Sequence, residues 1–143
     1  MFAIVREPID VATVARDVRT AACGAVITFA GVVRDTSDDE RAVSGLSYEA
    51  HESMAAEEFE RIAAEARERF GPCEISIVHR IGDLQVGDVS VAVAVAAPHR
   101  GAGFDACEYA IDELKRRATI WKKEHYIAGE SAWRTNPDRP ASA

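Results

Sequence analysis

The chain has 143 residues, of which 48% are hydrophobic and 29% are charged, and its formal net charge is -7. This length and composition predict one soluble globular domain that buries enough surface to need neither a disulfide nor a structural metal. The negative charge argues against a general nucleic-acid binder, and no apolar run approaches the ~20 residues that span a bilayer. Three scattered cysteines and the lack of a recognisable signal peptide indicate a reducing cytoplasm.

The first part of the chain is predicted to form a strand, a helix, a second strand and a loop. Residues 2–7 are β-branched and predict a strand, and residues 10–19 have helical apolar spacing with Asp10 as the expected N-cap. Residues 24–34 are β-branched on both faces, which predicts a buried strand. The polar and mostly acidic segment 35–42 is expected to be an exposed, mobile loop.

The remainder predicts three more strands around two long helices, with a short last strand near 129–133. The clearest helix, SMAAEEFERIAAEARERFGP, ends at Gly71 and Pro72. The segment DVSVAVAVAAPHR is apolar or small on both faces and should be the central strand. The second helix has an apolar face that we expect to consist of Phe104, Cys107, Ile111, Leu114 and Ala118.

This order of elements lacks the strict strand–helix alternation of a doubly wound sheet. It predicts an α+β fold with a mainly antiparallel sheet and two to three helices. We expect one domain over residues 1–134 and a C-terminal tail over residues 135–143, because the tail has no periodicity.

All three lysines of the chain, Lys115, Lys122 and Lys123, lie within nine residues, whereas the other cationic side chains are Arg apart from four His. Unlike Arg, a Lys at the edge of an apolar surface can lose its proton near neutral pH and act as a nucleophile or base. The alternative is snorkelling, in which the stem covers the core and the ammonium stays in water. The spacing alone leaves both open.

His99 and Arg100 follow the expected central strand directly, at a tight turn into a helix. The first N–H groups of a helix favour an anion, and this pair would add to that field. A loop His beside a surface Arg is the alternative. The other three His, at positions 51, 79 and 125, offer no metal-ligand spacing and are interpreted as structural or surface residues.

Several segments together resemble one family. FAGVVRD, LSYEAHESMA, VHRIGDLQVGDVSVAVAVAAPHR and AIDELKRRATIWKKE, with the late Trp133, resemble in order and spacing the MoaE family, the large catalytic subunit of molybdopterin synthase. The resemblance covers nearly all of residues 2–134. One departure is Thr119, where the family commonly has Pro, so the preceding helix is expected to run slightly further.

The resemblance implies an α/β-hammerhead fold and a homodimer that forms a heterotetramer with a ubiquitin-like sulfur carrier. The carrier's Gly-Gly tail would end in a thiocarboxylate, and its sulfur would pass to cyclic pyranopterin monophosphate to form molybdopterin. By the same resemblance Lys115 and Lys122 are the catalytic residues. The implied substrate-binding residues are Arg34, His99, Arg100 and Arg134. No metal or organic cofactor is implied.

Two other functions stay open at this point. The chain could be a dimeric scaffold that docks a ubiquitin-like partner without catalysis, against which the Lys115 and Lys122 pair argues. It could also be another anion-handling enzyme such as a small phosphohydrolase. That activity would need a metal cluster or a clear nucleophile, and the sequence shows neither.

Overall fold

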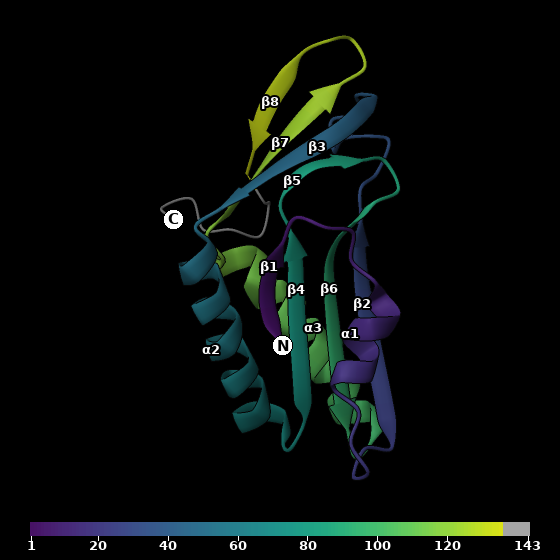
Figure 1. Ribbon diagram of the computed structural model, residues 1–143, viewed down its shortest axis with the longest axis vertical. Helices are drawn as coiled ribbons and strands as arrows, with labels where there is room; N and C mark the ends of the chain where they lie inside the picture. Colours follow the sequence, from purple (N-terminus) through teal and green to yellow (C-terminus); the bar gives the residue numbers. More distant parts are fainter. Residues whose placement is uncertain (136–143) are drawn as a thin grey trace.

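The computed structural model describes residues 1–135, which form two four-stranded sheets and three helices (Figure 1). The first sheet has the order β1 (Phe2–Val5), β4 (Glu74–Arg80), β6 (Val89–Ala97) and β2 (Ala25–Val32), and only its β1–β4 pair is parallel. The second has the order β5 (Gly82–Gln85), β3 (Val43–Ala50), β7 (Ile120–Tyr126) and β8 (Ser131–Arg134), all antiparallel. The predicted α+β class is confirmed.

The helices cover both faces of the first sheet. Figure 1 shows α1 (Val11–Asp17) in front of this sheet and α3 (Arg100–Arg117) behind it, with α2 (Glu52–Phe70) alongside α3. The main core lies between α2, α3 and alternate residues of β4 and β6, such as Ile77 and Val93, both fully buried. Val14 of α1 packs on the opposite face, and Asp10 caps α1 as expected. None of the described helices is long and apolar enough to cross a membrane.

Strand β6 is central, as predicted, but β2 is not buried. It lies at the edge of the first sheet, and its residues alternate between half-buried and exposed. Val26 is 39% exposed and Val32 is 51% exposed. The prediction was wrong because β-branched residues on both faces of a strand say nothing about what covers the outer face.

The apolar face of α3 also differs from the prediction at one end. Cys107, Ile111 and Leu114 are buried, but Phe104 is 61% exposed. Its neighbour Gly103 faces β2 instead, and a Cβ there would lie only 2.5 Å from the Ile27 side chain. A larger residue at position 103 would therefore require the Ile27 side chain to move.

The expected extension of α3 toward Thr119 is also wrong. The helix ends at Arg117, and Ala118 is extended, with φ -66° and ψ 140°. The chain must turn here because β7 begins at Ile120 to pair with β3.

Arg117 fixes the end of α3 to α2. Its Nε donates to Glu58 Oε1 at 2.6 Å, and its Nη1 donates to Glu65 Oε2 at 2.6 Å. Tyr109 also donates to Glu65, at 2.7 Å. These charge-assisted bonds hold the last turn of α3, which carries Lys115, in one position.

Candidate active site

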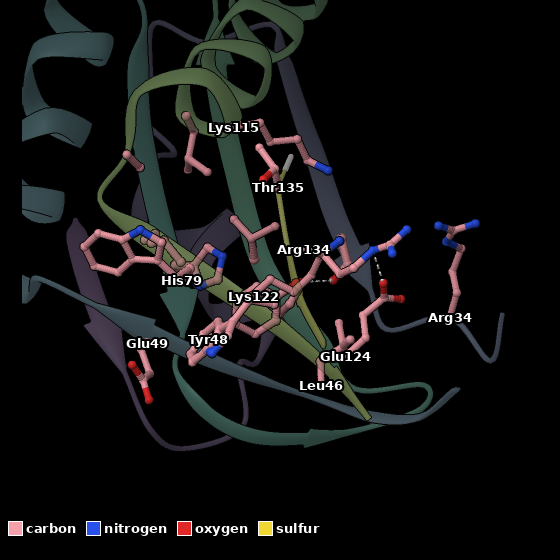
Figure 2. A pocket seen from close by; sticks show the side chains of 18 of the residues that line it. Arg34, Leu46, Tyr48, Glu49, His79, Lys115, Lys122, Glu124, Arg134 and Thr135 are labelled. Carbon is pink, nitrogen blue, oxygen red and sulfur yellow. Dashed lines mark hydrogen bonds and ion pairs between the residues drawn. The ribbon is translucent and has the colours of Figure 1, made fainter. Parts of the chain in front are cut away.

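A cavity of about 530 Å³ lies where the first sheet meets the second, beside the C-terminal end of α3 (Figure 2). Its walls come from β2, β4 and β6 of the first sheet, from β3, β7 and β8 of the second, and from the last turn of α3. Four of the six expected site residues line it: Arg34, Lys115, Lys122 and Arg134. The fold therefore brings together cations that are far apart in the sequence.

The two lysines reach the cavity from different elements. Lys115 projects from the last turn of α3 and is exposed, whereas Lys122 is half-buried in β7. Burial lowers the pKa of Lys122, and the nearby Lys115 charge lowers it further, although Glu124 acts in the opposite direction. A lowered pKa increases the fraction of free amine near neutral pH, which an Arg could not provide.

Glu124 sets the position of Arg134. The Arg134 Nε lies 2.9 Å from Glu124 Oε1 in an ion pair, and Glu124 is only 6% exposed. Lys122 and Glu124 are two residues apart on β7 and share its cavity face, and Lys122 is the register partner of Arg134 on β8. A nearly buried carboxylate thus holds one guanidinium beside the lysine. Glu124 was not among the predicted site residues, although the Lys-x-Glu spacing on a strand could have indicated it.

The acidic loop between β2 and β3 places carboxylates beside these cations. Arg34 Nη2 lies 2.7 Å from Asp38 Oδ1, and Arg134 Nη1 lies 3.6 Å from Asp39 Oδ2. A hydrogen bond from Arg34 is the main reason that the pKa of Asp38 is lowered, and the Lys122 and Arg134 charges contribute. Loop carboxylates therefore partly compensate the cavity's positive charge.

Ser37 closes this loop. Its side chain is buried, its N–H donates to Arg41 O at 2.9 Å, and its Oγ accepts from Arg41 N at 3.0 Å. Glu40 has a φ of 64°, in the left-handed region that tight turns use. The polar and acidic composition of the segment gave no sign of these hydrogen bonds. The mobility of the loop stays a prediction.

His99 and Arg100 do not line this cavity. Both are exposed and lie at the N-terminal end of α3, and Lys115 lies near its C-terminal end. A helix of 18 residues is about 27 Å long at 1.5 Å per residue. Within one chain, the pair and Lys115 therefore occupy opposite ends of the same helix.

His79 is a cavity residue that the sequence analysis interpreted as structural or surface. It is 4% exposed, lies in β4, and its ring packs edge-on against Tyr48 at 4.9 Å between centroids. Burial lowers the pKa of His79 to about 4, and the Lys115 charge contributes. The imidazole is therefore neutral near pH 7. The only sequence signal was its position at the end of an apolar strand.

Lys123 lies on the other face of β7, with its Nζ 5.6 Å from the Trp133 ring centroid. It is half-buried and does not line the cavity.

A Ser–His–Asp group on the second sheet does not form a nucleophile. Ser47 Oγ lies 2.6 Å from both Asp83 Oδ1 and His125 Nε2, and His125 Nδ1 lies 2.8 Å from Ser131 Oγ. Because the Ser47 proton is donated to Asp83, His125 Nε2 must donate to Ser47 Oγ and cannot act as its base. Among residues 1–135, no group of three His, Cys, Asp or Glu side chains is arranged to hold a metal ion.

The fold and the cavity thus define an α+β protein with a lysine- and arginine-lined pocket between two sheets. A profile of the MoaE protein family matches residues 4–117. The molybdopterin synthase catalytic subunit of Nostoc sp. is 45% identical over 133 residues, which is 92% of this chain and 80% of that protein. The chain belongs to the MoaE family.

Solved structures agree. The crystal structure of molybdopterin synthase from Staphylococcus aureus superposes with a TM-score of 0.88 at 39% identity, over 93% of this chain and 96% of that one. A chain from the complex of subunits 1 and 2 of molybdopterin-converting factor from Helicobacter pylori has a TM-score of 0.75 at 21% identity, over 98% and 94% of the two chains. The latter likeness shows the fold alone.

Proposed function

We propose that this chain is the catalytic subunit of a molybdopterin synthase. In this function it transfers sulfur from the thiocarboxylated Gly-Gly terminus of a small ubiquitin-like carrier to cyclic pyranopterin monophosphate. The observation that carries the proposal is the convergence of Lys115, Lys122, Arg34 and Arg134 in one cavity of about 530 Å³. Both reactants are anionic at their reacting ends, and the cavity supplies four cations for them.

The two lysines have different surroundings and different proposed roles. Lys115 is exposed beside the cavity, so it meets the terminal carbonyl of the incoming carrier tail. Lys122 is more buried and lies beside Glu124 and Arg134, where it stabilises negative charge as sulfur adds and the cyclic phosphate ester opens. Its lowered pKa also suits it to proton transfer near neutral pH.

Arg34 and Arg134 are proposed to bind the substrate phosphate, because each carries an exposed loop carboxylate that a stronger anion can displace. His99 and Arg100 are proposed to bind substrate as well, in the cavity of a second copy of the chain. Their separation from Lys115 along α3 supports this arrangement. The uncovered apolar side chains of Val26, Val32 and Phe104 support a homodimer, which would bind two carriers to give a heterotetramer.

The catalytic unit is proposed to be residues 1–134 with residues 135–143 as a tail, working in the cytoplasm. Thr135 lines the cavity, and residues 136–143 lie outside the described part of the chain.

The lysines provide the direct test, in an assay of molybdopterin formation from cyclic pyranopterin monophosphate and thiocarboxylated carrier. Lys115→Arg keeps the charge but removes the amine, so it should lose nearly all activity while still binding the carrier. Lys122→Arg should keep a measurable part of the activity. The matched control Lys123→Arg should be near wild type, because Lys123 does not line the cavity.

The same assay separates the scaffold alternative. If the chain is a non-catalytic scaffold, the wild-type protein will bind the carrier but form no molybdopterin. If wild-type protein is active and Lys115→Arg remains active, the chain is an enzyme but position 115 supplies only charge.

A further inference from the structure

The side chain of His79 presents a free hydrogen-bond acceptor to the cavity. Its Nδ1 lies 2.8 Å from the carbonyl oxygen of Arg80, so Nδ1 must carry the proton and donate it. In a neutral imidazole the other nitrogen, Nε2, then has a bare lone pair.

This lone pair opens into the cavity. No hydrogen bond involves Nε2 among the described residues, and no fully buried side-chain nitrogen or oxygen among them lacks a partner. The Nε2 atom is therefore not sealed inside the protein, although the residue is only 4% exposed. The space that His79 lines is the cavity that also contains Lys115 and Lys122.

The two ends of the cavity differ in chemistry. Figure 2 shows His79 and Tyr48 at one end and Arg34 at the other, with Lys122 and Arg134 between them. Apolar lining is added by Leu114, Ala118, Ile120 and Trp121. The charged lysine and arginine side chains of the cavity can only donate hydrogen bonds. A ligand with a flat uncharged ring at one end and a phosphate at the other would match this polarity.

We infer that His79 is a substrate-binding residue that accepts a hydrogen bond from a ring N–H of the heterocycle, while the phosphate lies toward Arg34 and Arg134. This rests on the proposed function, because that function supplies a ligand with a pterin ring and a phosphate. A neutral acceptor suits the role, since a protonated His would repel Lys115 and could not accept a bond from an N–H group. Burial, which keeps the pKa of His79 near 4, maintains that state.

The test uses a pterin without a phosphate, 6-hydroxymethylpterin, whose own fluorescence reports binding to the full-length protein without turnover. His79→Asn keeps a donor for the Arg80 carbonyl, but its shorter side chain places no acceptor at the position of Nε2. It should weaken binding by roughly three- to tenfold, the effect of one neutral hydrogen bond. His79→Gln, which can place an amide oxygen near the former Nε2 position, should restore most of the affinity.

The matched control is His51→Asn. His51 caps α2 outside the cavity, and Asn is a good N-cap, so the probe should bind this variant as it binds wild type. If neither His79 variant folds, 15N spectra of wild-type protein with labelled His replace them. The bare Nε2 resonance of His79 should then shift upfield when the probe binds.

Unchanged probe affinity in His79→Asn, or an unmoved Nε2 resonance in wild type, would overturn the assignment. Either result would overturn the assignment even if the variant forms less molybdopterin, since a loss of activity without a loss of pterin binding would give His79 a role in catalysis, like that of the lysines. Conversely, pterin binding that depends on His79 in a protein without synthase activity would refute the proposed function and leave this inference intact.

Discussion

Arg134 on β8 and Glu124 on β7 form an ion pair of 2.9 Å, in which the carboxylate is almost fully buried and the guanidinium reaches the cavity. A buried carboxylate is stable only when such a partner remains charged and hydrogen-bonded to it. The pair therefore joins the stability of the second sheet to the placement of a cation in the candidate active site.

Glu124→Gln should destabilise the protein by about 1–3 kcal/mol, the range for leaving a buried polar group without its partner. Urea unfolding measures this change. Glu130→Gln is the control, because Glu130 pairs with Arg41 at the surface and should cost about 0.5 kcal/mol or less. Equal losses in the two variants would show that burial of Glu124 does not matter.

The lowered pKa of His79 predicts a pH-dependent stability. Between pH 6.5 and about pH 4 the unfolded chain binds a proton at His79 that the folded protein does not, so stability falls as the pH falls through this window. From pH 7 to pH 5 the wild type should lose about 2 kcal/mol more unfolding free energy than His79→Gln.

Urea titrations of both proteins at the two pH values provide the measurement. The other three His and all carboxylates are common to both chains, so their contributions cancel in the comparison. Parallel pH profiles would mean that His79 is protonated as readily in the folded state as in the unfolded one.

Asp38 competes with anionic ligands for Arg34. Asp38→Asn should tighten the binding of inorganic pyrophosphate by about threefold at low salt, because a single exposed ion pair has a modest effect. Calorimetric titration gives the affinity. Asp35→Asn removes the same charge from the same loop, but the side chain of Asp35 accepts from Thr36 and, among the described residues, forms no ion pair with an arginine. Should both variants bind equally, the effect is one of net charge alone.

If His99 and Arg100 serve the cavity of a second copy, two inactive variants should complement each other. A mixture of Arg100→Ala and Lys115→Arg chains contains dimers in which one cavity has both residues intact. After subunit exchange, about one quarter of wild-type activity should return in an equal mixture of a two-fold dimer.

Each variant exchanged with itself serves as the control and should stay inactive. A mixture no more active than its components would place Arg100 outside the partner's cavity. Direct titration of Arg100→Ala with substrate tests its binding role independently, and unchanged affinity would contradict that role.

The sequence predicted local structure better than it predicted what surrounds each element. Asp10, the central strand β6 and the convergence of Lys115 with Lys122 followed from capping, patterning and family resemblance. The exposure of β2 and of Phe104 did not, because periodicity identifies an apolar face without showing what packs on it.

The roles of Glu124 and His79 depend on partners from other strands, and composition carries no trace of them. Glu124 meets Arg134 through the β7–β8 register, and His79 meets Tyr48 where the two sheets join. The sequence of the acidic loop likewise did not indicate that its carboxylates pair with Arg34 and Arg134.

Helix α3 fixes both the distance and the relative rotation between Arg100 at its start and Lys115 in its last turn. One residue inserted between Arg100 and Lys115 would rotate one end against the other by about 100° and shift it by about 1.5 Å. Such an insertion would turn Lys115 out of the cavity. It would also break the hydrogen bonds from Arg117 to Glu58 and Glu65 of α2, even though every side chain was retained. Variation in the length of α3 between Arg100 and Lys115 should therefore be strongly restricted.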